Sequence, residues 1–252
     1  MNAIKAFQPV VSIVGNTCRS LHASRSLTAN IDDLKIDWAQ RVMNCLNVSL
    51  TVRGEISDRP SLLFIGNHLS YLDIPLLMKV VRGASFVAKQ ELSRWPVFGY
   101  GARRIHTVFV DRSNANSRDG ARQALFQALD QGQRVTLFPS GTTNLGPAER
   151  WRKGGFEIAC ESNSWVQPFR ITYNPIREVA FIDDDAFLPH LYRLAKVPRI
   201  EAVIEFHSPV QITDPIQDCL TWKSWCEQEG FANHLLVKEG LPTLDMKSCD
   251  PS

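Results

Sequence analysis

Short runs of apolar and β-branched residues alternate with segments of helical periodicity along most of this sequence. The runs have the length and composition of buried strands, and the segments between them repeat apolar residues at helical spacing. Strands and helices in alternation are typical of an α/β sheet with helices on its faces. We therefore predict an α/β fold with a mixed, mostly parallel sheet of about seven strands, flanked by helices.

The predicted strands cover residues 48–54, 61–67, 84–89, 106–111, 134–139, 165–173 and 199–206. The predicted helices lie near residues 73–82, 114–131, 153–162 and 215–238. Neither an internal repeat nor a low-complexity linker divides this part of the sequence, so residues 48–252 are assigned to a single α/β domain. At 252 residues the chain is long enough to bury a sizeable core.

Residues 1–47 are predicted to form an N-terminal amphipathic helical segment that precedes the domain. Residues 1–30 are mixed in composition, and we expect part of them to be poorly ordered. Residues 32–47, "DDLKIDWAQRVMNCLN", carry apolar residues at helical spacing and a polar, partly basic side. This pattern fits a helix packed on the domain. It also fits a helix in a membrane interface, where Trp38 and basic side chains are favourable.

Charge and hydropathy limit the partners that the chain can have. No run approaches the roughly 18 apolar residues that cross a bilayer, and the N-terminus lacks the sustained apolar core of a secretory leader. We therefore expect a cytoplasmic protein whose contact with the inner face of the cell membrane is peripheral. The six cysteines form no C-x-x-C pair, which is typical of reduced thiols. A net charge of +2 is too small to suggest nucleic-acid binding, but it suits an anionic substrate or membrane face.

The segment "NHLSYLD" (residues 67–73) follows an apolar predicted strand, at a place where ligands of open α/β sheets bind. His68 and Asp73 are five positions apart, or about 140° around a regular helix, so they meet only if the chain bends between them. Pro75 favours a helix that begins near Leu72 or Asp73. His68 then lies in the preceding turn, from which its side chain can fold back towards Asp73.

Spacing alone leaves three interpretations of this pair. A carboxylate on one imidazole nitrogen fixes the tautomer and stabilises the cation that forms when the other nitrogen takes a proton, which is general-base chemistry. Alternatively, Asp73 caps the helix and His68 is incidental. A metal site is the least supported interpretation, because no second His or Cys lies at ligand spacing.

Further polar segments end other predicted strands. "FPSGTTNLG" (residues 138–146) is rich in small residues, which let backbone N–H groups converge on an anion or a developing oxyanion, but it also fits a plain turn. It is not a P-loop, because GKS or GKT is missing, and Phe138 replaces the first glycine of a G-x-S-x-G nucleophile elbow. Lys89 and Arg112 each end a predicted strand, either as solvated charges or as a pair that holds a phosphate.

In this order the segments resemble the motifs of the glycerolipid acyltransferases, in particular the 1-acyl-sn-glycerol-3-phosphate acyltransferases. That family carries N-H-x(4)-D, a lysine in A-K-x-E-L, then F-x-x-R, F-P-E-G-T and a hydrophobic stretch with a proline. The corresponding segments here read "NHLSYLD", "AKQEL", "FVDR", "FPSGT" and "VQPF" around Pro168. The resemblance runs from about Trp38 to Tyr173, and it implies the general-base interpretation of His68 and Asp73.

The resemblance implies transfer of a fatty acyl group from an acyl thioester, on acyl carrier protein or coenzyme A, to the free hydroxyl of a lysophospholipid. The implied acceptor is 1-acyl-sn-glycerol-3-phosphate and the product is phosphatidic acid, with no metal or other cofactor. His68 would take the proton of the hydroxyl, and Asp73 would orient His68. Lys89 and Arg112 would hold the phosphate. The implied substrate-binding residues are Asn67, Lys89, Arg112, Ser140, Gly141 and Thr142.

Two residues depart from the family motifs. Ser140 replaces the glutamate of F-P-E-G-T, and Thr143 replaces the arginine that often follows this motif. The two changes remove an ion pair and one phosphate contact, so they bear on the acceptor more than on acyl transfer itself. The alternative acceptor is another lysolipid, such as a lyso-ornithine lipid. Arg150, Arg152 and Lys153, in "ERWRKGGF" (residues 149–156), form a cationic cluster that is a candidate for the missing charge.

Two other classes of function stay open at this point. A serine or thioester hydrolase would use Ser140 or Ser70, and replacing Ser140 would then abolish activity. An inactive lipid-binding homologue, which lost activity through the change at position 140, would bind lipid without turnover.

Overall fold

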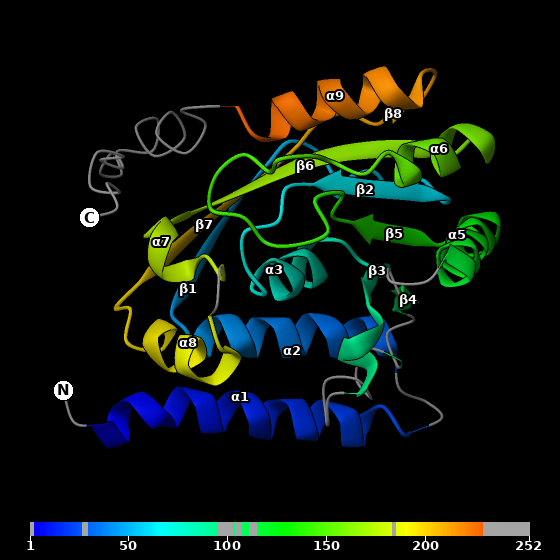
Figure 1. The fold of residues 1–252 in the computed structure, drawn as a ribbon. Coiled ribbons are helices and arrows are strands. Elements are labelled where there is room, and N and C mark those ends of the chain that lie inside the picture. Colours follow the sequence, from blue (N-terminus) through cyan, green and yellow to red (C-terminus); the bar gives the residue numbers. More distant parts are fainter. Residues whose placement is uncertain are drawn as a thin grey trace.

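The computed structural model describes residues 3–26, 30–94, 103, 107–110, 115–182 and 185–228. A sheet crosses the middle of the molecule, with helices on both of its faces (Figure 1). Its strands are β1 (Val48–Arg53), β2 (Leu62–Gly66), β3 (Ala84–Lys89), β4 (Val108–Val110), β5 (Arg134–Leu137), β6 (Trp165–Asn174), β7 (Ile200–Phe206) and β8 (Val210–Gln211).

The strands lie in the order β1-β7-β6-β2-β5-β3-β4, and β8 pairs with β6. β6, β2, β5, β3 and β4 run parallel to one another, and β1 runs parallel to β7. β7 and β8 run antiparallel to β6. The predicted fold class is therefore confirmed: each predicted strand is present, and the two-residue strand β8 makes an eighth.

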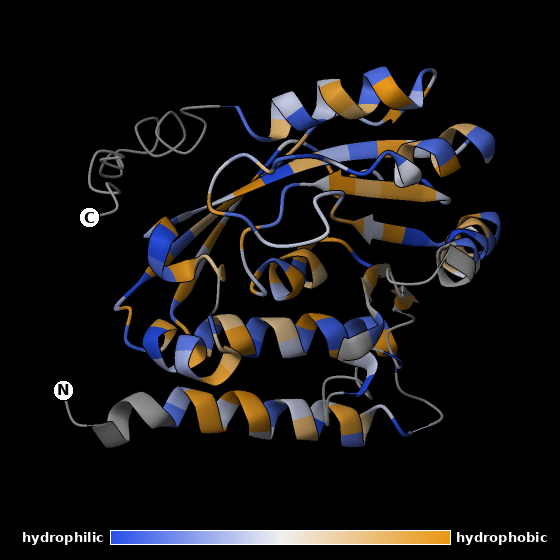
Figure 2. Ribbon diagram, in the orientation of Figure 1, coloured by the Kyte–Doolittle hydropathy of each residue, from blue (hydrophilic) through white to orange (hydrophobic). Residues whose placement is uncertain are grey.

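The central strand β2 explains why helices cover both faces. All of its residues are buried, and Figure 2 shows it as largely apolar. Side chains alternate along a strand, so Leu62 and Phe64 enter the core on one face while Leu63 and Ile65 enter the core on the other. A strand that is covered on both sides needs apolar residues at successive positions, and the segment before "NHLSYLD" supplies them.

One face of the sheet is covered by α2 (Ile31–Cys45), α3 (Asp73–Val80) and α8 (Phe187–Leu194). The other face is covered by α5 (Ala115–Asp130), α6 (Gly154–Glu161) and α9 (Pro215–Cys226). Two short helical turns, η1 (Gln90–Arg94) and α7 (Ile176–Val179), lie at loops.

The predicted N-terminal helical segment is present. The chain forms α1 (Ala3–Ala23), which lies along α2 as an outer layer (Figure 1). Part of residues 1–30 was expected to be poorly ordered, and residues 3–23 of this range form the helix. It is held because Ile13 is buried in the core and because Trp38 Nε1–H donates a hydrogen bond to Thr17 Oγ1 at 3.0 Å.

α2 is a packed helix. It lies between α1 and α3 and buries Ala39, Val42 and Met43. Its first turn is capped by Asn30, whose side chain accepts the N–H groups of Asp32 and Asp33. Of the two interpretations of residues 32–47, packing on the domain is the one that the fold bears out. The exposed apolar residues of the N-terminal segment belong to α1 instead.

Two other differences concern the second half of the chain. The sequence analysis predicts no element between residues 174 and 198, where the structure has α7 and α8. The last predicted helix is present as α9, and its predicted residues beyond 228 lie outside the described part of the chain. No helix among the described residues is both long and apolar enough to span a membrane.

Candidate active site

Four neighbouring parallel strands, β2, β5, β3 and β4, end at the same edge of the sheet. The chain passes through them in the order β2, β3, β4, β5, so this edge gathers segments that are far apart in the sequence. The predicted site residues follow these ends: Asn67 and His68 after β2, Ser140 after β5, Lys89 at the end of β3 and Arg112 beyond the end of β4. Arg112 lies outside the described residues, and only the backbone of Lys89 is described.

The chain leaves β2 through a close contact with β6. A Cβ at Gly66 would lie 2.4 Å from the carbonyl oxygen of Phe169, so this position needs glycine. At the next residue, Asn67 Nδ2–H donates to the carbonyl oxygen of Ile171 at 2.9 Å, and Asn67 Oδ1 accepts the N–H of Ile171 at 2.8 Å. The Asn67 amide thus fastens the start of the loop to β6. Its role in substrate binding stays a prediction.

His68 and Asp73 meet across the bend that their spacing requires. His68 Nδ1 lies 2.6 Å from Asp73 Oδ2. The Asp73 side chain is fully buried, whereas 18% of the His68 side chain is exposed. The same carboxylate oxygen accepts the backbone N–H groups of Leu69 at 2.8 Å and Ser70 at 3.2 Å. We call His68 and Asp73 the relay pair.

The carboxylate does not serve as a helix cap. α3 begins at Asp73, as predicted, but its N-cap residue is Leu72 and no side chain caps it. The donors to Asp73 come from the loop before the helix rather than from the helix, so the capping interpretation is wrong. Within the described ranges, no group of three or more His, Cys, Asp or Glu side chains is arranged to hold a metal ion.

The imidazole ring of His68 is held on two sides. Because Nδ1 faces the carboxylate, the hydrogen-bond network assigns the ring proton to Nδ1 and the free lone pair to Nε2. The ring of Phe138 stacks on it, with centroids 4.0 Å apart and planes 12° apart. Nε2 has no hydrogen-bond partner among the residues that the structure describes. A fixed imidazole with one free nitrogen can accept a proton from a hydroxyl group.

The loop after β5 is tied to the relay pair. The N–H of Asn144 donates to the carbonyl oxygen of His68 at 2.9 Å. Gly141 turns the loop with a φ of +75°, which favours glycine, and its N–H donates within the turn to Phe138 at 3.0 Å. The carbonyl oxygen of Thr142 accepts from Ser140 Oγ at 2.7 Å and from Asn144 Nδ2 at 2.9 Å. The loop that holds Ser140, Gly141 and Thr142 is therefore anchored to His68 through Phe138 before them and Asn144 after them.

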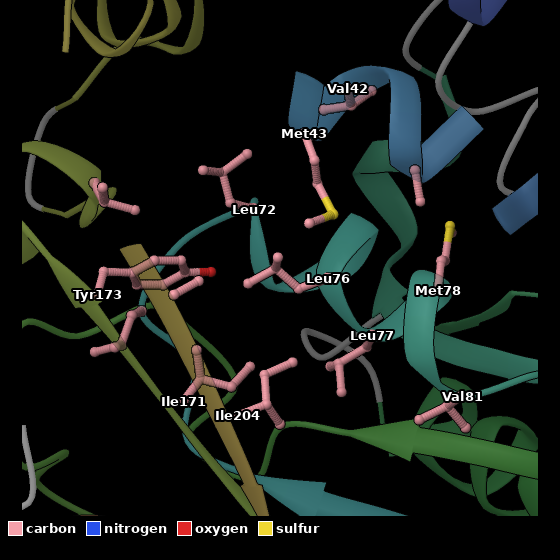
Figure 3. Packing of buried hydrophobic residues seen from close by; sticks show 14 of the residues in the cluster. Val42, Met43, Leu72, Leu76, Leu77, Met78, Val81, Ile171, Tyr173 and Ile204 are labelled. Carbon is pink, nitrogen blue, oxygen red and sulfur yellow. The ribbon is translucent and has the colours of Figure 1, made fainter. Parts of the chain in front are cut away.

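A further donor to the buried carboxylate escapes the sequence analysis. The hydroxyl of Tyr173 donates to Asp73 Oδ1 at 2.5 Å across 100 positions of sequence, and both side chains are fully buried. Burial, followed by the nearby Asp73 carboxylate, raises the pKa of Tyr173 well above its ordinary value, so the hydroxyl stays a donor. Figure 3 shows its ring reaching from β6 towards the start of α3. The one signal in the sequence is that Tyr173 ends a predicted strand.

The segment around α8 holds the loop from the outside. The hydroxyl of Tyr71 donates to His190 Nδ1 at 2.8 Å, and His190 Nε2–H donates to the carbonyl oxygen of Ala180 at 3.0 Å. The N–H of Phe181 donates to the carbonyl oxygen of Leu69 at 3.0 Å. Burial lowers the pKa of His190, and a neutral imidazole suits its two bonds, in which Nδ1 accepts and Nε2–H donates. No sequence signal relates these residues to the motif.

The cationic cluster predicted near the site is exposed. Arg152 is attached to the loop after β5, because its N–H donates to the carbonyl oxygen of Pro139 at 3.0 Å. The neighbouring Lys153 pairs with Glu157 on α6 at 3.0 Å. The Arg152 side chain has no ion-pair partner within the described residues, so its charge is available to a ligand.

Comparisons with known proteins identify the family of this chain. Residues 49–172 match the family described as "Acyltransferase". A lyso-ornithine lipid O-acyltransferase of Pseudomonas aeruginosa is 34% identical over 178 residues, which cover 69% of this chain and 68% of that protein. The chain belongs to the acyltransferase family. A 1-acyl-sn-glycerol-3-phosphate acyltransferase of Neisseria meningitidis is also 34% identical to this acyltransferase, over 112 residues that cover 44% of each chain.

The fold of this acyltransferase is similar to that of a solved relative. The 1-acyl-sn-glycerophosphate (LPA) acyltransferase PlsC of Thermotoga maritima superimposes with a TM-score of 0.63, over 99% of this chain and 96% of that one. The sequence identity is 20%, so this likeness concerns the fold. The resemblance inferred from the motifs is confirmed: the protein is an acyltransferase.

Proposed function

We propose that this acyltransferase moves a fatty acyl group from an acyl thioester to the free hydroxyl of a lysophospholipid, with His68 as the general base. The observation that carries the proposal is the 2.6 Å contact between His68 Nδ1 and Asp73 Oδ2, which leaves Nε2 free to take a proton. Asp73 orients the ring and stabilises the imidazolium cation that forms.

The proposed reaction is a substitution at the thioester carbon. Nε2 takes the proton of the acceptor hydroxyl while the hydroxyl oxygen bonds to the carbonyl carbon. The carbon–sulfur bond then breaks, and the thiolate leaves with its electron pair. The proton on Nε2 passes to the thiolate, so the products are an ester and a thiol, and His68 is neutral again. Base catalysis of this kind contributes typically about 10²- to 10⁴-fold, and positioning of the two substrates supplies most of the rest.

The serine residues give no support to a hydrolase. Ser140 Oγ donates to the carbonyl oxygen of Thr142 at 2.7 Å. Ser70 is fully buried, and its Oγ accepts the N–H of Leu72 at 3.3 Å. Neither hydroxyl is hydrogen-bonded to His68, so neither is activated as a nucleophile.

The first candidate acceptor is 1-acyl-sn-glycerol-3-phosphate, which would give phosphatidic acid. Lys89 and Arg112 are proposed to hold its phosphate. In support, Lys89 ends β3 in register with Val110, the last residue of β4, and Arg112 follows two positions later. Two cations that leave neighbouring strand ends suit one doubly charged headgroup.

A lyso-ornithine lipid is the second candidate acceptor, and a specific contact favours it. Thr143 stands where the family often has arginine, so this position contributes no charge, and its hydroxyl donates to the carbonyl oxygen of Phe181. An ornithine headgroup carries a carboxylate and an ammonium group, and it needs fewer cations than a phosphate. The relative named for this acceptor also aligns with more of the chain, 69% against 44%.

The donor is proposed to be a thioester of acyl carrier protein or coenzyme A, since the reaction needs only the thioester carbon and the thiolate leaving group. Both carriers present this group, so the assay below includes both.

The N-terminal segment, residues 1–47, is proposed to contact the inner face of the cell membrane peripherally, because the acceptor is a lipid. The support lies on the outer side of α1, where 64% of Val11 and 45% of Val14 are exposed and the exposed Arg19 follows. Apolar side chains beside a cation suit an interface with anionic headgroups. Recovery of the full chain in the soluble fraction at low salt, without detergent, would contradict this part of the proposal.

The test is transfer of radiolabelled acyl groups from acyl-coenzyme A and acyl-(acyl carrier protein) to a panel of lysolipids. Wild type is expected to acylate at least one acceptor, and His68→Ala to lose this activity. Ser140→Ala is expected to lose far less than His68→Ala, whereas a serine hydrolase would show the reverse. Transfer to lyso-ornithine lipid without transfer to lysophosphatidate would select the second acceptor. Lipid binding without turnover on any acceptor would identify an inactive homologue and refute the proposal.

A further inference from the structure

The two oxygens of the Asp73 carboxylate are held by different parts of the chain. Oδ2 receives His68 Nδ1–H and two backbone N–H groups, all from the loop that follows β2. Oδ1 receives the hydroxyl of Tyr173 from β6 at 2.5 Å. The loop alone therefore leaves one oxygen of a buried carboxylate unpaired, and β6 supplies the missing donor.

Strand β6 holds both ends of the "NHLSYLD" segment. Ile171 exchanges two backbone hydrogen bonds with the side chain of Asn67 at the start of the segment. Two positions further along the same strand, the hydroxyl of Tyr173 donates to Asp73, which is the last residue of the segment. A strand rises about 3.3 Å per residue, so these two contacts fix the spacing between the loop start and the carboxylate.

The surroundings of Tyr173 fix the direction of its hydroxyl. Its ring lies beside Leu72 and Ile171, with Leu76 and Ile204 close by (Figure 3). All of these side chains are at most 2% exposed. A ring enclosed by apolar side chains cannot swing away. The hydrogen bond to Asp73 is shielded from water, and hydrogen bonds are stronger in such an interior than in water.

We propose that Tyr173 is a positioning residue for acyl transfer. Its hydroxyl holds the carboxylate of Asp73 in the orientation that points His68 Nε2 at the acceptor, and it sets how strongly the relay pair binds a proton. This inference rests on the proposed role of His68 as the general base.

The direction of the effect follows from charge. Before it takes the proton of the acceptor, the relay pair carries one negative charge, and afterwards it carries none. A donated hydrogen bond stabilises the charged state more than the neutral one. Removing the Tyr173 hydroxyl therefore favours the protonated pair, whichever of its members carries the proton. In the variant the relay pair therefore stays protonated, and cannot act as a base, up to a higher pH than in wild type.

Burial shifts the pKa of the other titratable groups near the relay pair away from the neutral range. Burial raises the pKa of Tyr71, Tyr173 and Cys226, and burial lowers the pKa of His190. The titratable groups that the structure places next to the "NHLSYLD" segment are Tyr71 in the segment itself, Tyr173 on β6, His190, which is bonded to Tyr71, and Cys226, whose thiol donates to the carbonyl oxygen of Phe169 on β6.

The experiment measures kcat and KM for the acceptor against pH, in the full chain, for wild type, His68→Ala, Tyr173→Phe and Tyr71→Phe. For Tyr173→Phe we expect the midpoint of the acidic limb of kcat/KM to rise by about one pH unit, which is a tenfold change in proton affinity. We also expect kcat at its plateau to fall about tenfold with KM nearly unchanged, because the reacting atoms are less well oriented.

Tyr71→Phe is the matched control. It removes a phenol hydroxyl from the same loop, but one that is bonded to His190 rather than to Asp73. Its acidic midpoint is expected to equal that of wild type. If the role of Tyr173 is purely structural, Tyr173→Phe has a lower melting temperature than wild type, but the midpoint of its acidic limb of kcat/KM equals that of wild type.

If Tyr173→Phe does not fold, 3-fluorotyrosine at position 173 keeps the ring and the hydroxyl. Fluorine makes the hydroxyl a stronger donor, so the midpoint is then expected to move to lower pH. A folded Tyr173→Phe with the wild-type midpoint and kcat, or no shift with 3-fluorotyrosine, overturns the inference. When the inference is overturned in this way, the activity of His68→Ala shows how much fails. An inactive His68→Ala means that only the role of Tyr173 is refuted. A His68→Ala variant as active as wild type means that the proposed general base is refuted as well.

Discussion

Replacing Asp73 by asparagine separates the charge of the relay pair from its shape. Asp73 is fully buried, and the amide has nearly the same size, so no cavity forms. If the amide oxygen takes the Oδ2 position, it still accepts the N–H groups of the loop. The NH₂ group then faces Tyr173, whose hydroxyl can turn to accept instead of donating.

What Asp73→Asn loses is the negative charge beside the imidazolium cation. Two unit charges about 4 Å apart interact by about 4 kcal/mol at an effective dielectric constant of about 20. A hydrogen bond to a charged group exceeds a neutral one by about 1 to 2 kcal/mol. Because the transition state carries only part of the proton, we expect a loss of about 2 to 4 kcal/mol. This corresponds to kcat/KM lower by about 30- to 1,000-fold.

The assay is steady-state transfer from the better of the two thioester donors to the preferred acceptor, at the pH optimum of wild type. Thermal melting checks that the variant is folded. Asp33→Asn is the control, because Asp33 is an exposed carboxylate on α2 that pairs with Arg82. A folded Asp73→Asn that keeps more than a third of the wild-type kcat/KM would refute the role of the carboxylate charge.

Three further outcomes are expected. Arg152→Ala should raise the KM for the acceptor several-fold if its charge replaces the missing arginine. A KM equal to that of wild type in both Arg152→Ala and Arg150→Ala would make the cluster a surface feature. Asn67→Ala should lower the free energy of unfolding in urea by about 2 kcal/mol, since it leaves both backbone groups of Ile171 without their side-chain partner. Between pH 7 and pH 5 the free energy of unfolding should fall with decreasing pH, with a contribution from His190 of at most about 1.4 kcal/mol per pH unit. In the unfolded protein His190 takes up a proton near its ordinary pKa, whereas burial lowers its pKa in the folded protein, so the folded protein takes up this proton only at a lower pH. Above pH 7 His190 is neutral in both the folded and the unfolded protein and contributes no slope. His190→Asn should therefore remove this part of the pH dependence.

The fold was predictable because its central strands carry strong local signals. The buried strand β2 has apolar residues at every position before its glycine, and α3 begins where Pro75 indicates. The bend between His68 and Asp73 also followed from local geometry, since their spacing does not let them meet on a regular helix.

What could not be predicted depends on contacts between distant segments. α1 packs on α2, and Pro9 lies inside it, where a sequence pattern would favour a break in the helix. α8 has only eight residues, and it is held by the contacts of His190 with Tyr71 and Ala180. The hydrogen bond between Tyr173 and Asp73 joins residues 100 positions apart. No periodicity in either segment reports on such a partner.

The order of the strands also bears on how the protein is made. β2 has its neighbours β5 and β6 much later in the chain, and β1 pairs with β7, near the end of the described sheet. Pairings between distant segments raise the contact order, which slows folding. A nascent chain that stops before Tyr173 exposes the apolar β2 and lacks the donor that completes the Asp73 carboxylate. Synthesis therefore passes through a long aggregation-sensitive stage, and the candidate active site is complete only after β6 has been made.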